Sequence, residues 1–68
     1  MKPYEKYGEA IAKLRKQNGW SQEELAARAK LDPKSVVQIE NAKRNPTLKT
    51  LQKIASALNV SISKLLEG

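Results

Sequence analysis

The stretch from residue 21 to residue 41 constrains the fold more than any other part of the chain, because it contains two helix starts a short distance apart. The first start is a capping box formed by Ser21 and Glu24. The serine hydroxyl accepts from a backbone N–H of the first turn, and the glutamate carboxylate reaches back to the start of the helix. Leu25, Ala26 and Ala29 then recur at helical spacing and predict a buried helix face.

The second helix start lies at Asp32 and Pro33. Aspartate is a preferred N-cap, and proline suits the first helical position because its missing N–H has no helical partner there. Only Lys30 and Leu31 remain to turn the chain between the two helices. Helices joined by so short a turn must cross steeply, and we therefore predict a helix-turn-helix unit.

The second helix of this unit has two different faces. At 100° per residue, Val36, Ile39 and Glu40 lie on the inner side. The other side presents a cation, amides and an exposed apolar side chain: Lys34, Val37, Gln38 and Asn41. Such groups hydrogen-bond base edges and phosphates and contact thymine methyl groups, so this face favours DNA recognition.

The segment SQEELAARAKLDPKSVVQIEN resembles the helix-turn-helix of the phage-repressor and Cro family of bacterial transcription regulators, the xenobiotic-response-element-like group. The resemblance extends over residues 8–66. It implies an all-α fold, a compact five-helix repressor-like DNA-binding domain in which helices 2 and 3 form the helix-turn-helix. It also implies a regulator that binds an operator.

The flanking sequence supplies the other helices of this single domain, which we expect over residues 1–68. A first helix, ending near Gly19, carries one inner face made of Tyr4, Tyr7, Ile11, Leu14 and Asn18. Thr47 caps an amphipathic fourth helix with the apolar residues Leu48, Leu51, Ile54, Ala55 and Leu58. Ser61 caps a short fifth helix, and no segment has the pattern of a strand.

Composition narrows the class of protein. The 68 residues carry a net charge of +6 and contain no cysteine and no histidine. A positive charge favours a polyanionic partner, although many small domains are basic for solubility alone. We expect no metal site, no cofactor and no enzymatic activity, because cysteine, histidine, a facing pair of carboxylates and a glycine-rich phosphate loop are lacking. We also expect no membrane segment and a cytoplasmic location.

The positive charge surrounds the helix-turn-helix. Residues 1–20 carry +3, residues 21–41 carry −1 and residues 42–68 carry +4. This distribution is expected if the flanks hold phosphates while the central unit reads bases.

Individual DNA contacts can be assigned from the chemistry and the resemblance. Lys34 and Gln38 are the best candidates for guanine and adenine edges, Val37 for a thymine methyl and Ser35 for a phosphate. The resemblance implies that Gln22 grips a phosphate and supports the recognition helix. It also implies phosphate contacts from the stretch after that helix, which contains Asn41, Lys43 and Arg44. The alternative for this stretch is a solvated basic loop.

The chain departs from the family pattern at three positions. Lys30 and Ala42 stand where many members have glycine, which would cost about 1 kcal/mol if either backbone position requires a positive φ. Pro33 stands where the family often places a base-contacting side chain, so base reading should shift toward Lys34 and Val37.

Arg15 and Glu40 are predicted to form a structural ion pair. Both point toward one core, where an unpaired charge would be very costly, and the resembled family commonly has such a pair. The alternative is two independent surface charges.

Three functions remain open. The first is a transcriptional regulator, most simply a repressor, that binds a palindromic operator in double-stranded DNA as a homodimer. The dimer interface would use the fifth helix, with Leu65 inward and Ile62 or Leu66 partly exposed; the alternative is that all three side chains complete the core. The second is an antitoxin that binds a toxin protein and regulates its own operon; the end of the chain at Gly68 favours the first function over this one. The third is a protein-interaction bundle without a DNA role.

Overall fold

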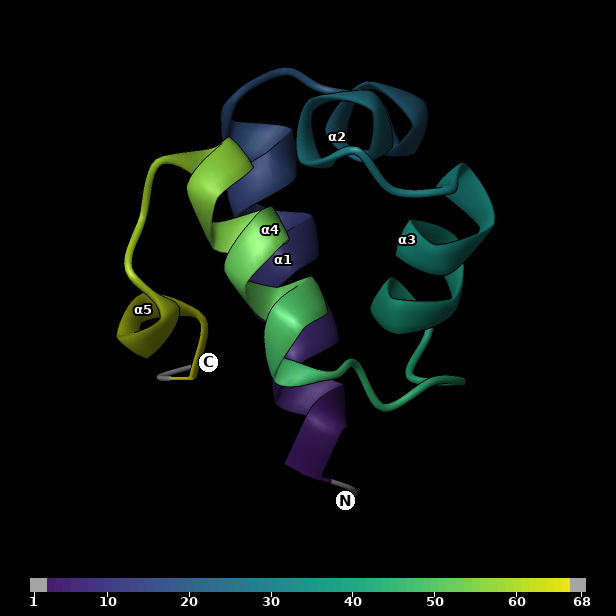
Figure 1. Cartoon of the computed structure of the whole chain (residues 1–68), viewed down its shortest axis with the longest axis vertical. Helices are drawn as coiled ribbons and strands as arrows, with labels where there is room; N and C mark the ends of the chain where they lie inside the picture. Colours follow the sequence, from purple (N-terminus) through teal and green to yellow (C-terminus); the bar gives the residue numbers. More distant parts are fainter. Residues whose placement is uncertain (1–2, 67–68) are drawn as a thin grey trace.

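Five α-helices follow one another along the chain (Figure 1). The computed structural model describes the backbone of residues 3–66 and the side chains of residues 5–66, so the expected inner position of Tyr4 lies outside the described residues. The helices are α1 (Pro3–Gln17), α2 (Gln22–Ala29), α3 (Pro33–Glu40), α4 (Leu48–Leu58) and α5 (Ile62–Leu66). This order confirms the all-α prediction with α2 and α3 as the helix-turn-helix.

The start of α2 contains half of the predicted capping box. The Ser21 hydroxyl accepts from the Glu24 backbone N–H at 3.0 Å, as expected. The Glu24 carboxylate does not return to Ser21 in the described structure; it accepts from Arg28 Nε at 2.8 Å instead. Arginine lies one turn further along the same helix face, and its charge makes it a better donor than a backbone amide.

The starts of α3 and α4 follow the predicted capping. Asp32 Oδ1 accepts from the Lys34 backbone N–H at 2.8 Å, with Pro33 in the first turn. Thr47 Oγ1 accepts from the Thr50 backbone N–H at 3.1 Å. These side chains satisfy amide groups that have no partner within their own helix, and they therefore fix where each helix begins.

Left-handed backbone conformations turn the chain at four corners. Gly19 has φ +73°, at the position after α1 where glycine was expected. Lys30, Ala42 and Asn59 have φ values of 58°, 57° and 59°. The corners after α2 and α3 therefore need a positive φ, and Lys30 and Ala42 adopt it with the steric penalty of a Cβ atom.

The hydrophobic core lies where α1, α4 and the helix-turn-helix meet. Its fully buried large side chains come from all five helices: Ile11, Leu25, Val36, Ile39, Ile54 and Leu65. Figure 1 shows α3 and α5 on opposite sides of α1 and α4, which overlap in this view. The outer face of α3 is consequently left open on one side of the molecule.

A single glycine sets the distance between α1 and α3. A Cβ atom added to the buried Gly8 would lie 2.4 Å from the Ile39 carbonyl oxygen and 3.0 Å from that of Glu40. Real Cβ atoms do not approach so closely, so glycine lets α1 pack directly against the backbone at the end of α3. The position of α3 is thus fixed by backbone contact.

Candidate nucleic-acid interface

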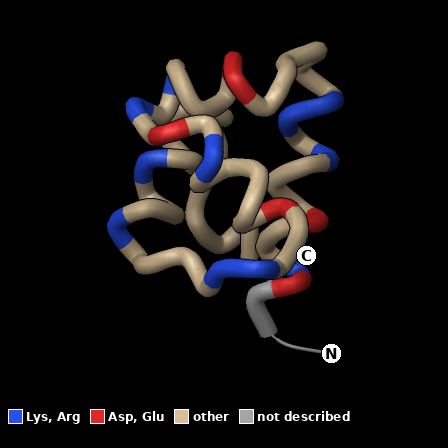
Figure 2. Tube along the Cα trace, turned by 90° about the vertical axis from the view of Figure 1, so that its right-hand side faces the viewer, with Lys and Arg blue, Asp and Glu red and all other residues tan. Residues whose placement is uncertain are grey.

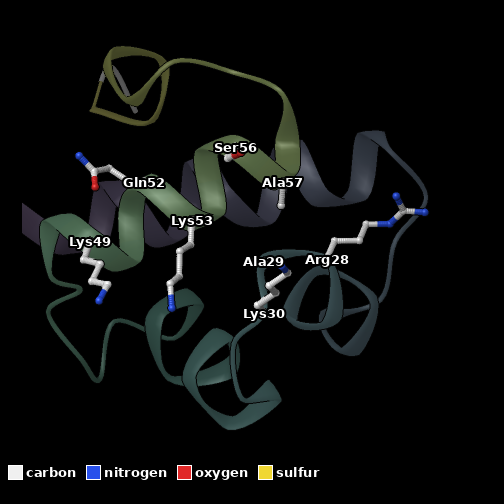
Figure 3. A pocket seen from close by; sticks show the side chains of 8 residues that line it. All are labelled: Arg28, Ala29, Lys30, Lys49, Gln52, Lys53, Ser56 and Ala57. Atoms are coloured by element: carbon white, nitrogen blue, oxygen red, sulfur yellow. The ribbon is translucent and has the colours of Figure 1, made fainter.

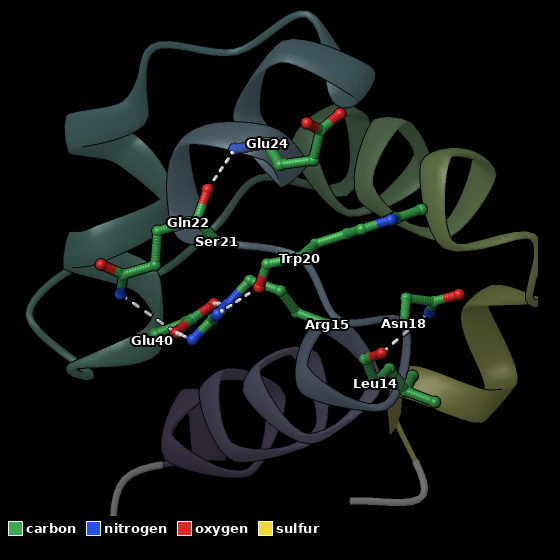
Figure 4. A network of polar contacts seen from close by, with 8 residues as sticks. All are labelled: Leu14, Arg15, Asn18, Trp20, Ser21, Gln22, Glu24 and Glu40. Atoms are coloured by element: carbon green, nitrogen blue, oxygen red, sulfur yellow. Dashed lines mark hydrogen bonds and ion pairs between the residues drawn. The ribbon is translucent and has the colours of Figure 1, made fainter.

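A buried ion pair joins α1 to the end of α3 (Figure 4). Arg15 Nε donates to Glu40 Oε2 at 2.7 Å, and Arg15 Nη2 donates to Glu40 Oε1 at 3.0 Å. The side chains retain only 10% and 4% of their accessible surface. Arg15 Nη1 also donates to the Trp20 carbonyl oxygen at 2.7 Å, which ties the loop before α2 to the same group.

The ion pair also holds the first residue of α2. Gln22 Nε2 donates to Glu40 Oε1 at 3.1 Å, so that the amide lies at the N-terminus of α2 beside the end of α3. The hydrogen bond with Glu40 raises the pKa of Arg15, against the burial that would lower it. The guanidinium therefore stays charged, and Glu40 serves as a shared acceptor for α1 and α2.

The outer face of α3 carries the predicted base-reading residues. Lys34 is exposed in the first turn, while Val37 and Gln38 are half-buried along the middle of the helix. Asn41 is exposed at the C-cap. Pro33 at the start of α3 has no hydrogen-bond donor in its side chain or its backbone, as expected for proline. The structure thus brings a cation, an amide and an apolar group together on one side of a short helix.

The loop after α3 returns to the same helix. Arg44 Nη1 donates to the half-buried Ser35 hydroxyl at 3.0 Å, and the Lys43 backbone N–H donates to the Gln38 carbonyl oxygen at 2.9 Å. Both basic side chains are exposed. The loop cations therefore lie beside α3, with Arg44 anchored to it.

Basic residues surround this face of the molecule. Figure 2 looks onto the side that carries α3 and shows lysine and arginine segments mainly around its edges, with acidic segments among them. The arrangement agrees with the sequence distribution, in which the helix-turn-helix itself is slightly acidic. Phosphate contacts at the edges and base contacts in the centre are the usual division of roles in protein–DNA interfaces.

The sequence reasoning missed one group of cations. Lys30 at the end of α2 lies across a surface groove from Lys49 and Lys53 of α4, and Arg28 lines the same groove. Nineteen or more residues separate Lys30 from the α4 lysines in the sequence, so local pattern alone could not place them together. The one feature of the sequence that pointed to this group was the spacing of Lys49 and Lys53, which places them one helical turn apart on the same helix.

The predicted dimer residues lie on α5. Leu65 is completely buried, Ile62 is half-buried and Leu66 keeps 47% of its surface exposed. Leu48 at the start of α4 is also exposed, at 63%. The exposed side chains of Leu48 and Leu66 are therefore available for contact with another molecule.

Within residues 3–66, no three side chains of the metal-binding types aspartate, glutamate, histidine or cysteine gather at one place. The helices described there are also too short or too polar for any of them to cross a bilayer.

Comparisons with known proteins agree with the geometry. The family described as Helix-turn-helix matches residues 11–65. The control protein C.MunI from a Mycoplasma species is 41% identical over 61 residues, which are 88% of this chain and 82% of that protein. Among solved structures, the restriction-modification controller protein C.AhdI from Aeromonas hydrophila superposes with a TM-score of 0.88. It is 35% identical, with 91% of this chain and 94% of that one covered.

A relative with a different role is also similar. The antitoxin HipB from Escherichia coli strain K12 is 37% identical over 54 residues, which cover 79% of this chain and 61% of that protein.

Proposed function

Because the chain belongs to the helix-turn-helix family of transcription regulators, we propose that it recognises a palindromic operator in double-stranded DNA as a homodimer and represses transcription there. Residues 1–68 would form one DNA-binding domain without catalytic activity, acting in the cytoplasm. The observation that supports this most strongly is the arrangement around α3. Its outer face presents Lys34, while Glu40 at the end of α3 holds the Gln22 amide and Ser35 near the start of α3 holds Arg44.

The residues on α3 would read bases. Lys34 can donate to the O6 and N7 atoms of guanine, Gln38 can pair with an adenine edge, and Val37 can contact a thymine methyl group. Since Pro33 cannot donate, specificity in the first turn rests on Lys34.

The residues around α3 would hold phosphates. Gln22 combines an amide donor with the N-terminus of α2, where the helix dipole favours an anion. Asn41 and Lys43 would contact the backbone near the same end of α3, and Arg44 with Ser35 nearer its start. The pair of Arg15 with Glu40 fixes the Gln22 amide relative to α3, and thereby sets the distance between phosphate and base contacts.

The homodimer would form through α5. One recognition helix reads few base pairs, whereas two copies related by a two-fold axis double the contact and place their helices about 34–36 Å apart. Leu66 and the half-buried Ile62 supply the apolar surface for this interface. Replacing Leu66 by glutamate should therefore weaken dimerisation, while Leu65 stays in the core.

Selection of duplexes from a random DNA pool, followed by binding titrations, tests this proposal. The selected site should be palindromic with half-site centres about 10 bp apart and should bind two protomers. Lys34→Ala should cost about 1–3 kcal/mol and relax preference at one position of each half-site. Saturation at one protomer per duplex would refute the dimer. Weak binding without sequence preference would refute the operator-binding role.

A role as an antitoxin is the second candidate, and the similarity to HipB supports it. The neighbouring gene separates the two functions. If that gene arrests growth when expressed alone and permits growth when this chain is present, the antitoxin role holds. If it encodes a restriction or modification enzyme, a controller role like that of C.AhdI is favoured instead.

A further inference from the structure

We propose that the groove between the end of α2 and α4 binds the phosphate backbone of the operator strand opposite the strand held by Gln22. This inference rests on the proposed function. The groove has a volume of about 520 Å³, and four cations but no acidic residue line it: Arg28, Lys30, Lys49 and Lys53. Gln52 and Ser56 add uncharged donors to the same wall.

Three of these cations are free to bind an anion. Arg28 is occupied, since its Nε contacts Glu24 at 2.8 Å and its guanidinium lies 4.3 Å from the centre of the Trp20 ring. Within the described residues, Lys30, Lys49 and Lys53 take part in no ion pair, and all three are exposed. Figure 3 shows the Arg28 guanidinium at the far end of the groove, away from the α4 lysines.

The placement of these lysines opposes stability in three ways. Lys49 and Lys53 are like charges one helical turn apart on α4, where they repel each other. Lys49 also lies in the first turn of α4, which contains no acidic residue and carries the positive end of the helix dipole. Lys30 occupies a left-handed corner that glycine would fill without strain. A polyanion in the groove would relieve both charge conflicts.

The position of the groove beside α3 indicates that the polyanion it binds is duplex DNA. Figure 3 shows Lys49 and Lys53 extending from α4 on the side where α3 lies. Gln22 and Lys30 flank opposite ends of α2, whose eight residues span about 12 Å. The major groove is also about 12 Å wide. With α3 in the major groove of the DNA, Gln22 would contact the phosphates along one edge of the major groove. The protein groove between α2 and α4 would then face the phosphates along the other edge.

Salt-dependent binding to the selected operator and to a scrambled duplex tests the inference. The variants are Lys53→Gln and the double change Lys49→Gln with Lys53→Gln. The matched control is Lys13→Gln, which removes the same charge from an exposed position on α1, a helix that lines neither the groove nor the proposed α5 interface. Thermal melts accompany the titrations. The groove variants should melt at a slightly higher temperature, because a like-charge repulsion is removed, so a loss of binding would not reflect unfolding.

We expect the double variant to bind both duplexes about tenfold more weakly at moderate salt, with the ratio between operator and scrambled duplex unchanged. The slope of log affinity against log salt should become shallower by about 0.9 for each phosphate that the variant no longer neutralises. Lys13→Gln should remain within about twofold of the wild type, since none of the proposed phosphate contacts lies on α1.

Three results would overturn the inference. If the wild type binds its operator and the groove variants behave like Lys13→Gln, the groove has no DNA role, while the proposed function stands. The inference also fails if the groove variants keep their DNA affinity but no longer bind an acidic peptide, since the occupant would then be a protein. If the wild type binds no duplex at all, both proposals fail.

Discussion

The Glu40→Ala substitution tests how much the buried ion pair contributes to stability. Glu40 accepts three hydrogen bonds: two from Arg15 and one from Gln22. Without the carboxylate, a guanidinium with 10% of its surface exposed keeps only its bond to the Trp20 carbonyl oxygen. Leaving one member of a buried pair uncompensated costs about 3–5 kcal/mol.

This loss is comparable with the whole stability of the domain. At about 0.05–0.15 kcal/mol per residue, 68 residues give roughly 3–10 kcal/mol of unfolding free energy. Glu40→Ala should therefore be close to unfolding in water at 25 °C. Urea melts followed by helical circular dichroism, with trimethylamine N-oxide added if needed, give the free energy of unfolding.

Glu24→Ala is the matched control. It also breaks a Glu–Arg pair through Nε at nearly the same distance, 2.8 Å, but on side chains that are 46% and 51% exposed. An exposed pair contributes about 0–1 kcal/mol, so this variant should remain stable. The double change Arg15→Met with Glu40→Leu should recover most of the loss, because it removes both charges together. If Glu40→Ala lies within about 0.5 kcal/mol of the wild type, or matches Glu24→Ala, the reasoning is refuted.

Three further substitutions address the backbone and the interface. Gly8→Ala should destabilise by about 1–3 kcal/mol in a urea melt, since its Cβ would meet the Ile39 carbonyl oxygen at 2.4 Å; a gain in stability from the better helix former would contradict the close contact. Ala42→Gly should raise the free energy of unfolding by up to about 1 kcal/mol, because glycine adopts the left-handed conformation of this corner without the strain of a Cβ atom. A decrease in the free energy of unfolding would instead mean that the corner tolerates the alanine side chain. Gln22→Ala should weaken binding to every duplex by a similar factor, and a change in sequence preference would instead assign it to base reading.

The sequence was sufficient to predict the helices because their ends depend on local chemistry. Ser21, Asp32 and Thr47 begin α2, α3 and α4 through hydrogen bonds that span two or three residues. Apolar spacing identified most of the inner faces: Leu65 and Ile39 are buried as that spacing required, whereas Asn18 and Leu48 are exposed. Such signals do not depend on how the helices pack.

Contacts between distant residues were predictable only where a strong physical constraint acted. Arg15 and Glu40 are 25 residues apart, yet the cost of burying a lone charge identified them as partners. No comparable physical constraint identified Gln22 as a further partner of Glu40, because an amide side chain can remain solvated; only the family resemblance implied that Gln22 supports α3. The gathering of Lys30 with Lys49 and Lys53 was also hidden, since exposed cations carry no signal of where they meet.

The direct contact of Gly8 with the end of α3 has a consequence for the DNA itself. A recognition helix that rests on backbone atoms, with a buried charge pair beside it, has little freedom to tilt toward a poorly placed half-site. In the proposed dimer on its operator, the duplex would have to bend or twist to match two rigid helices, and the energy of that deformation depends on the base sequence. We therefore expect operator affinity to vary with the base pairs between the half-sites, where stiff and flexible steps differ although no side chain touches them.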